Sequence, residues 1–355
     1  MSERIVVAMS GGVDSSVAAA LLAEQGHEVI GMTMHLAGDA SRCCSLDDVE
    51  DARRVARALG IRFYVAPYQD RFRREVIEPF ADAYLAGRTP IPCVTCNRRF
   101  KFHHLLSRAR ALGADRIATG HYARIDTDPE SGAFRLHAAV DAAKDQSYFL
   151  FDLAQRQLAR IALPLGGLRK DEVRARARAL GLATAEKPES QEICFVPAGD
   201  YARAVEQIRP DAAPAPGDIV HEDGRVLGRH AGIHHFTVGQ RRGLRLSAGE
   251  RLYVTRIDPE RARVVVGAED ALLAHAARLE SVSWIAGEAP AEPVRARVRV
   301  RYRHGGADAV IEPDGTDGAR VRFSAPVRAL APGQVAVFYD GDRVLGGGWI
   351  GREPA

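Results

Sequence analysis

The sequence predicts an α/β protein in which a parallel-sheet nucleotide-binding domain precedes a small central domain and a C-terminal antiparallel β-barrel. Three observations predict this architecture. Short apolar runs alternate with helical patterns in the first half of the chain, a Pro/Ala-rich segment at 210–217 interrupts them, and short strands separated by turns follow. We therefore expect domains at residues 1–205, 206–272 and 273–355.

The first domain repeats strand and helix. Apolar, β-branched runs predict strands at 5–9, 29–35, 62–66 and 116–119, and apolar residues at helical spacing predict helices at 13–25, 46–59, 72–86 and 100–112. Gly26, Gly60 and Gly113 follow three of these helices, as is typical of residues that end a helix. This repetition favours a parallel sheet with helices on both faces, whose ligands bind beyond the carboxyl ends of the strands.

Turn signals divide the second half of the chain into short strands. They include Asp-Gly at 223–224, Asp-Pro at 258–259, Gly-Gly at 305–306 and Asp-Gly at 340–341. The stretch 218–270 reads as a small, mostly stranded central domain. From about residue 273 onward the pattern predicts a small antiparallel barrel or sandwich.

Composition narrows the class of protein. Of the 355 residues, 46% are hydrophobic and 27% are charged, which is the balance of a globular chain. The net charge of +3 excludes a polybasic tail, and no run of about 18 apolar residues predicts a membrane span. The first residues lack a signal-peptide pattern, so we expect a cytoplasmic protein whose five cysteines are thiols, metal ligands or catalytic sulfurs.

The segment from Ser10 to Ser16, SGGVDSS, follows the first strand and opens the first helix. Two glycines let the backbone approach an anion, and the N-terminus of the helix offers N–H groups and the positive end of its dipole. A simple helix cap is the alternative, but a cap needs one such residue rather than two glycines among three serines and an aspartate. We therefore predict a phosphate-binding loop, although it lacks the Gly-Lys-Ser/Thr ending of Walker-type loops.

The cysteines suggest sulfur or metal chemistry. Cys93 and Cys96 form a C-x-x-C pair in a segment expected to be a loop, and Cys194 follows 98 residues after Cys96. The pair is a redox or metal-binding unit, while Cys194 reads either as a third reactive thiol or as a packed one between two apolar residues. The adjacent Cys43 and Cys44 are poorly placed to chelate one ion and receive no role.

Together these motifs resemble those of the tRNA-specific 2-thiouridylases, which belong to the ATP-pyrophosphatase superfamily. The resemblance covers essentially the whole chain. The segments that carry it are SGGVDSS at 10–16, GMTM at 31–34, Cys96-Asn97 with Lys101-Phe102, ATGHYA at 118–123, KDQSYFL at 144–150, SQEICF at 190–195 and TVGQRRGL at 237–244.

The resemblance implies an adenine nucleotide alpha-hydrolase-like fold and an enzyme, a tRNA-uridine 2-sulfurtransferase. Such an enzyme uses ATP and Mg²⁺ to adenylate O2 of uridine 34, in the anticodon stem-loop of tRNAs for Lys, Glu and Gln, and replaces that oxygen by sulfur. Asp14 is the expected ligand of Mg²⁺. The ATP contacts that it implies are Ala8, Met9, Ser10, Gly11, Gly12, Val13, Asp14, Ser15, Met34 and Gly120.

The resemblance also implies the route of the sulfur. Cys194 receives a persulfide from a donor protein, such as a cysteine desulfurase or a relay protein. Cys96 then attacks it, which leaves a Cys96–Cys194 disulfide. Cys93 stands where many members of the family have Asp. It is either a substitute group near the target base or, with Cys96 and Cys194, a ligand of a [4Fe–4S] cluster.

Contacts with tRNA are expected on two parts of the chain. Alternation from Arg295 to Arg303 predicts one strand face with five arginines, read as a phosphate-binding face rather than an ordinary solvated one. His230, His234 and His235 read as polar or RNA-contacting residues, because no carboxylate or cysteine cluster is near them in the sequence. The tRNA contacts that the resemblance implies are Cys93, His121, Lys144, Asp145, Gln146, Arg301, Tyr302 and Gln334.

Two rival functions stay open at this stage. An amidating or ligating ATP-pyrophosphatase would release pyrophosphate in response to a small carboxylate or amide rather than to tRNA. A non-catalytic tRNA-binding module would keep its function when Asp14 or Cys96 is replaced.

Overall fold

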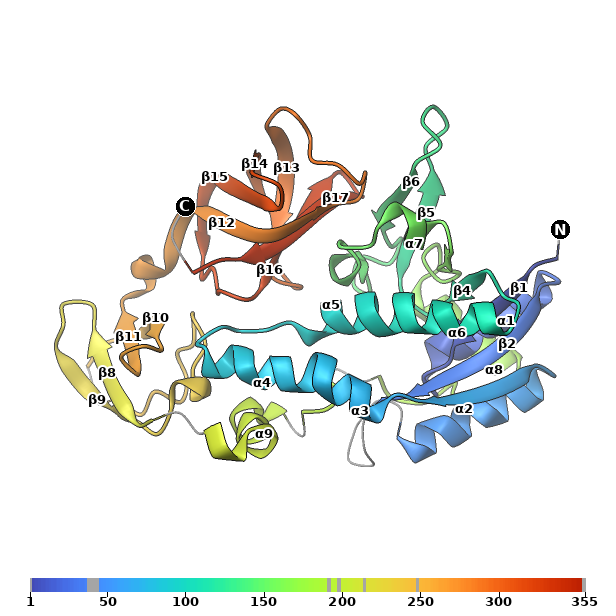
Figure 1. The fold of residues 1–355 in the computed structure, drawn as a ribbon, viewed down its shortest axis with the longest axis horizontal. Helices are drawn as coiled ribbons and strands as arrows, with labels where there is room; N and C mark the ends of the chain where they lie inside the picture. The colour runs from blue at the N-terminus through green and yellow to red at the C-terminus, as the bar shows by residue number, and fades with distance from the viewer. Residues whose placement is uncertain are drawn as a thin grey trace.

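A computed structural model describes residues 2–36, 45–189, 193–196, 199–212, 215–246 and 249–352. The first domain is built on a parallel sheet with the strand order β3-β2-β1-β4-β7. This confirms the predicted parallel sheet. Strands β1, β2 and β4 of this sheet are labelled in Figure 1. The bounds of its strands are β1 Arg4–Ala8, β2 Glu28–His35, β3 Arg62–Pro67, β4 Arg116–Ala118 and β7 Ile161–Ala162.

Both faces of this sheet are buried because its strands are apolar on both sides. On β1, Ile5 and Val7 pack in one cluster with helices α1, α2 and α8, whereas Val6 packs in another cluster with α6. The sheet therefore lies between two helical layers. The bounds of these helices are α1 Val13–Glu24, α2 Leu46–Ala58, α6 Leu105–Ala111 and α8 Lys170–Ala179.

The segment with the C-x-x-C pair is helical, so the expectation of a loop there was wrong. Helix α5 (Pro92–Cys96) continues through the π-helical segment η2 (Asn97–His104) into α6. Pro92 is compatible with this start, because a residue in the first turn has no helical partner for its N–H. A π-helical segment also interrupts the helix predicted at 72–86, which divides into α3 Gln69–Phe72, η1 Arg73–Ile77 and α4 Glu78–Leu85.

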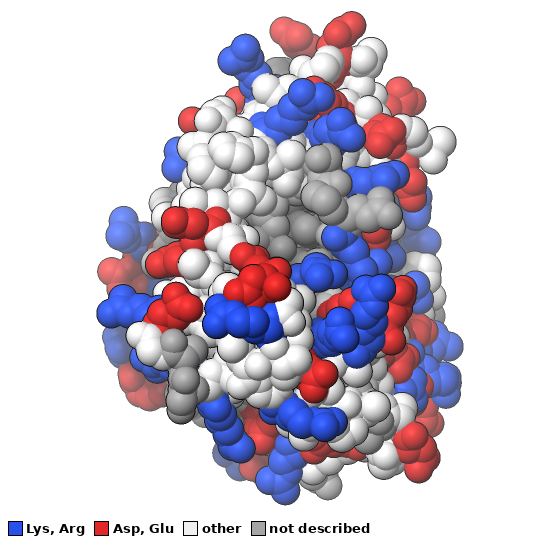
Figure 2. Space-filling model, turned by 90° about the vertical axis from the view of Figure 1, so that its left-hand side faces the viewer, with Lys and Arg blue, Asp and Glu red and all other residues white. Residues whose placement is uncertain are grey.

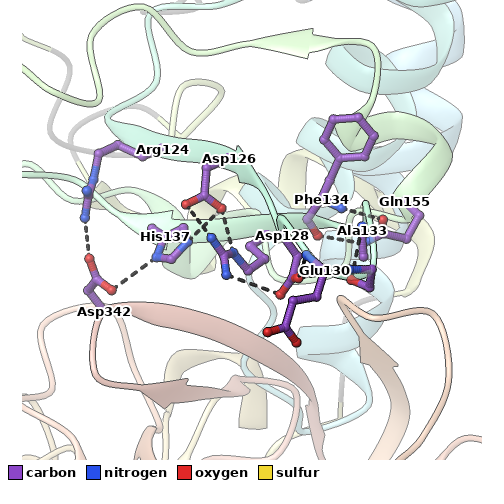
Figure 3. Close-up of polar contacts among 11 residues, drawn as sticks. Arg124, Asp126, Asp128, Glu130, Ala133, Phe134, His137, Gln155 and Asp342 are labelled. Carbon is purple, nitrogen blue, oxygen red and sulfur yellow. Dashed lines mark hydrogen bonds and ion pairs between the residues drawn. The ribbon is translucent and has the colours of Figure 1, made fainter.

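A hairpin of the first domain extends the sheet of the last one, which the sequence did not indicate. Strands β5 (Ala123–Thr127) and β6 (Phe134–Ala138) pair with each other, and β6 pairs with β17. His137 on β6 lies between Asp126 and Asp342, at 3.2 and 3.1 Å, and Arg124 also pairs with Asp342 (Figure 3). The hairpin thus fixes the barrel to the first domain.

The C-terminal domain is a closed antiparallel barrel, as predicted. Its first strand β12 pairs with both β15 and β17, which closes the ring of six strands, and the β5–β6 hairpin extends the sheet beyond β17. The prediction that five arginines share one strand face was wrong. Strand β13 ends at Arg299, so Arg301 and Arg303 lie in the following turn. The strands are β12 Leu273–Trp284, β13 Val294–Arg299, β14 Ala307–Asp314, β15 Gly318–Arg328, β16 Val335–Asp340 and β17 Arg343–Ile350.

The central domain is a four-stranded sheet of order β10-β11-β8-β9 with its own apolar core. Figure 2 shows the end of the molecule that this domain and the barrel form, where basic and acidic side chains are interspersed. None of the helices in the described ranges is long and apolar enough to cross a membrane. The strands are β8 Gly217–His221, β9 Val226–His230, β10 Tyr253–Asp258 and β11 Arg263–Gly267. The short helices are α7 Gln155–Leu158, α9 Tyr201–Ile208, η3 Ser147–Phe149, η5 Pro210–Ala212, η6 Ile233–His235 and η7 Glu269–Leu272.

Candidate functional site

The predicted phosphate-binding loop follows β1 at the carboxyl edge of the parallel sheet. Its hydroxyls hold the loop itself, since Ser15 Oγ and Ser16 Oγ donate to Gly12 O at 3.2 and 2.8 Å. Ser10 is exposed, and no described side chain caps the first turn of α1 at Gly12. The N–H groups of this turn therefore remain available for an anion.

Two glycines permit close packing around the loop. Gly11 has φ +73°, and a Cβ there would lie 2.2 Å from Asp48 O at the start of α2. Gly120, after β4, packs on the start of α1, where a Cβ would lie 2.7 Å from both Asp14 C and Ser15 N. Side chains at either position would collide with backbone. The sequence reading identified both residues without knowing these neighbours.

We expect Gly120→Ala to displace the loop, because the new methyl group meets backbone atoms that have no rotamer to change. The KM for ATP should rise about tenfold or more, and the free energy of unfolding should fall by about 1–3 kcal/mol. Gly167→Ala is the matched control, since a Cβ at Gly167 meets no atom within 4 Å. Equal KM values in the two variants would show that this contact does not shape the loop.

A chain of alternating charges runs from the loop through Lys170 and Glu189 to Lys144. Lys170 Nζ, at the start of α8, lies 2.7 and 2.8 Å from the two carboxylate oxygens of Asp14 and 2.7 Å from Glu189 Oε1. Lys144 Nζ lies 2.6 Å from Glu189 Oε2. Lys170 is 9% exposed, so its ammonium group depends on these two carboxylates for compensation. The sequence reading missed both Lys170 and Glu189.

This arrangement does not suit Asp14 as a magnesium ligand. Both of its oxygens accept from Lys170, and Oδ1 also accepts from the hydroxyl of Tyr122 at 2.8 Å. Mg²⁺ prefers an octahedron of oxygen ligands and in phosphate sites is held largely by substrate phosphates and water. Asp14 therefore acts here as the partner of Lys170. A magnesium ion that accompanies ATP would supply charge neutralisation on the phosphate oxygens.

Strand ends provide the rest of the expected nucleotide site. Ala8 ends β1, and Met9 continues its ladder through a hydrogen bond from its N–H to Met32 O. Met34, near the end of β2, is 5% exposed and packs into the core on the α6 side of the sheet. The neighbouring Thr33 Oγ1 donates to Met9 O at 2.6 Å, which ties the ends of β1 and β2 together.

The three described cysteines come from two parts of the first domain. Cys93 and Cys96 lie three residues apart on α5, which places them on one side of the helix. Cys93 is exposed, Cys96 and Cys194 are partly buried, and none of the three is in a disulfide. Cys96 and Cys194 pack against the same apolar cluster. Cys43 and Cys44 lie outside the described residues, as do residues 190–192 of the motif before Cys194.

The positions of the three cysteines bear on whether they could hold a single metal ion or an iron–sulfur cluster. The one group of three or more potential ligand atoms within 4.8 Å of one another in the described ranges contains no cysteine, so the three thiols do not form a ready site for a single ion. A cluster distributes its thiolates over different irons and needs them further apart. Two of the thiols lie on one side of α5 and the third comes from another segment, and the assignment of all three to a cluster stays a prediction.

Several residues predicted to contact tRNA are held within the protein. Asp145 is 4% exposed and accepts from Ala139 N, Ser147 N and Arg299. His121 is also buried, with Nδ1 2.7 Å from Thr119 Oγ1, and burial beside Lys101 lowers its pKa well below the usual value. These two side chains therefore position the segments around them.

The remaining predicted contacts differ in exposure. Arg301 is exposed, whereas Tyr302 is partly buried, with its ring centroid 4.6 Å from that of Phe149. Gln146 Oε1 accepts from Tyr122 N at 3.0 Å, and Gln334 Nε2 donates to Thr89 O at 3.0 Å. Arg301 is thus the residue of this group with the most open route to an RNA phosphate.

A buried carboxylate beside the helix of the C-x-x-C pair was also missed. The side chain of Asp152 is 1% exposed, lies 3.5 Å from Arg98 Nε, and has no hydrogen bond to its oxygens among the described residues. Burial raises the pKa of Asp152 to about 6, against the attraction of Arg98. No sequence signal distinguishes this aspartate, because its burial depends on tertiary packing.

The raised pKa of Asp152 predicts a pH-dependent stability. The folded state binds the proton more tightly than the unfolded state. Ionisation of Asp152 therefore lowers the free energy of unfolding as the pH rises from about 4 to about 6. Asp152→Asn should therefore be more stable than the wild type at pH 7.5, by up to about 3 kcal/mol, and equally stable near pH 4. Thermal unfolding at both pH values measures this. A pH-independent difference would contradict it.

Comparisons with known proteins identify the family. Family models match residues 3–198 (tRNA methyl transferase HUP domain), 205–268 (tRNA methyl transferase PRC-barrel domain) and 274–350 (aminomethyltransferase beta-barrel domain). A tRNA-specific 2-thiouridylase MnmA of Solibacter usitatus is 51% identical over 98% of both chains. That of Geobacter metallireducens is 52% identical over 98% of this chain and 96% of its own.

Solved structures are more distant. An RNA complex of a 4-thiouridine synthetase with bound ATP is 20% identical, with a TM-score of 0.38, and covers 59% of this chain and 51% of its own. An NMN synthetase of Francisella tularensis is 19% identical, with a TM-score of 0.34, and covers 53% and 67%. The assignment therefore depends on the relatives that align from end to end, and through them the chain belongs to the tRNA-specific 2-thiouridylase family.

Proposed function

We propose that this protein is an ATP-dependent tRNA sulfurtransferase that replaces O2 of uridine 34 by sulfur in tRNAs for Lys, Glu and Gln. The observation that carries the proposal is the combination of two features in one domain. An uncapped helix start with two close-packed glycines suits a pyrophosphate, and two partly buried thiols pack against one apolar cluster.

Activation of the base comes first in this proposal. O2 of the uridine attacks the α-phosphorus of ATP, pyrophosphate leaves, and the base carries AMP on its former carbonyl oxygen. The start of α1 and the exposed Ser10 would hold the leaving pyrophosphate, and Lys170 would supply a buried positive charge beside it. Adenylation is needed because a carbonyl oxygen is otherwise a poor leaving group.

Sulfur transfer follows. The Cys96 thiolate attacks Sγ of a persulfide on Cys194, so that a Cys96–Cys194 disulfide forms and hydrosulfide leaves. Hydrosulfide attacks C2 of the uridine, and AMP leaves with the oxygen. The sulfur is reduced by two electrons from the two thiols, and an external thiol reductant must reopen the disulfide. The exposed Cys93, on the same side of α5 as Cys96, would face the substrate.

Separating the two half-reactions tests this proposal. In Cys96→Ser and Cys194→Ser, tRNA-dependent release of pyrophosphate should continue within about threefold of wild type, while 2-thiouridine falls below detection because one thiol cannot complete the exchange. Pyrophosphate release and nucleoside composition would be measured on the same samples.

The rival functions give other outcomes in that experiment. Pyrophosphate release that responds to a small carboxylate or amide, and not to tRNA, would identify a small-metabolite enzyme. Thiolation that survives loss of either cysteine would overturn the persulfide route. Thiolation that requires bound iron and Cys93 would instead assign the three cysteines to a [4Fe–4S] cluster.

A further inference from the structure

A second set of metal-ligand residues lies far from the cysteines along the chain, where the first domain meets the central one. Within the described ranges, the one group of three or more His, Cys, Asp or Glu side chains with ligand atoms less than 4.8 Å apart consists of Glu206, His234 and His235. Glu206 is on α9, and both histidines are on η6. The sequence reading rejected a metal at these histidines because it found no nearby carboxylate, and folding supplies one.

The donor atoms converge on one point. Glu206 Oε1 lies 3.0 Å from His234 Nε2 and 3.5 Å from His235 Nε2. Ligands of a tetrahedral zinc ion at its usual bond lengths of about 2.1 Å lie about 3.4 Å from one another. Adjacent histidines often point apart. Here the short helix η6 brings the ring centroids to 4.2 Å and turns both Nε2 atoms toward Glu206.

Burial supports a role beyond a surface ion pair. The side chain of His234 is only 3% exposed, and its Nδ1 makes no hydrogen bond among the described residues. A buried polar atom without a hydrogen bond lowers the free energy of unfolding by about 1–3 kcal/mol, and an apolar side chain of similar size would avoid this cost. The side chains of Glu206 and His235 are 48% and 37% exposed, so one side of the group is open to water. Two imidazoles, one carboxylate and an open position are a donor set that zinc accepts.

We propose that Glu206, His234 and His235 bind one divalent transition-metal ion, with Zn²⁺ the best match, and that this ion fastens α9 to η6. The apolar contacts at this junction include the cluster of α4 and α9 residues around Phe80 and Val205, while Ile233 and Phe236 belong to the core of the central domain. A metal across the junction would add a bond to the contacts that α4 and α9 already make with η6.

The cysteines make the experiment demanding, because thiolates also bind zinc and cobalt. Co²⁺ distinguishes the two sites: thiolate ligands give an intense near-ultraviolet charge-transfer band, whereas nitrogen and oxygen ligands give only visible bands. The full-length chain, stripped with a chelator, would be titrated with Co²⁺ and then with Zn²⁺ by calorimetry. A variant with all five cysteines replaced by Ser repeats the titration without thiols.

We expect one Co²⁺ per chain that gives visible bands without the charge-transfer band, both in the wild type and in the cysteine-free variant. His235→Gln and Glu206→Gln should each weaken Zn²⁺ binding at this site at least tenfold, whereas the exposed His275→Gln should bind as the wild type does. Zn²⁺ should also raise the melting temperature of the wild type and not of His235→Gln. Zn²⁺ binding that is equal in the wild type, His235→Gln, Glu206→Gln and His275→Gln, or that disappears in the cysteine-free variant, would overturn the proposal.

Discussion

Lys170→Met should reduce tRNA-dependent release of pyrophosphate by on the order of 100-fold or more. The ammonium group lies between Asp14 on the phosphate-binding loop and Glu189, and it is almost fully buried. Its loss removes a buried positive charge beside the predicted phosphate-binding loop. It also leaves two carboxylates without their common partner, so the free energy of unfolding should fall by about 3 kcal/mol. Pyrophosphate release under saturating tRNA measures the first effect, and chemical unfolding measures the second.

Arg178→Met provides the control for this result, because Arg178 lies on the same helix as Lys170. Its ion pair with Glu186 is exposed, with side chains 55% and 74% accessible. Exposed pairs contribute little, so we expect activity within about twofold of wild type and a stability change below about 1 kcal/mol. If Lys170→Met behaved in the same way, Lys170 would have no part in ATP use.

Arg299→Met should lower the melting temperature by roughly 5–10 °C. Arg299 ends β13 of the barrel, and its Nη1 lies 2.8 Å from Asp145 Oδ2 in the first domain. The guanidinium group also lies over the rings of Tyr148 and Tyr339, at 5.6 and 5.4 Å. Without it, a carboxylate that is 4% exposed loses its cation. Thermal unfolding, with limited proteolysis at the barrel, would report both stability and attachment of the domain.

A double variant measures the contribution of the Arg299–Asp145 ion pair. If the cost comes from an unpaired charge on Asp145, then Arg299→Met combined with Asp145→Asn should be more stable than Arg299→Met alone. Arg295→Met, at an exposed position of the same strand, should leave the melting temperature nearly unchanged. A double variant that loses the sum of the two single losses would contradict this explanation.

The elements nearest the N-terminus could be predicted from the sequence because their signals are local. β1, α1, β2, α2 and β3 begin within one residue of the expected positions, and glycines follow the helices as expected. The loop from Ser10 to Ser16 follows the same logic, since glycines and hydroxyls at a helix start are visible in seven residues. The nucleotide and tRNA contacts assigned to individual residues remain predictions.

Partners that are far apart in the sequence could not be predicted. Lys170 is 156 residues from Asp14, and Arg299 is 154 residues from Asp145. No pattern along the chain indicates which of the many arginines becomes buried. The alternation around Arg299 instead suggested a uniform basic face, because the end of β13 depends on pairing with β14 and β16. Glu206 likewise joins His234 and His235 only through the contact of α9 with η6.

The formation of 2-thiouridine at position 34 tests the proposed function most directly. Anaerobically purified protein would be assayed for iron and acid-labile sulfide. It would then be incubated with ATP, a persulfide donor and an unmodified tRNA for Lys, Glu or Gln, for both the wild type and Cys93→Ala. We predict that iron-free protein forms 2-thiouridine at position 34 of the tRNA and releases one pyrophosphate per sulfur inserted. The Cys93→Ala variant should also form this product. The absence of 2-thiouridine with every donor and tRNA, despite bound ATP, would contradict it.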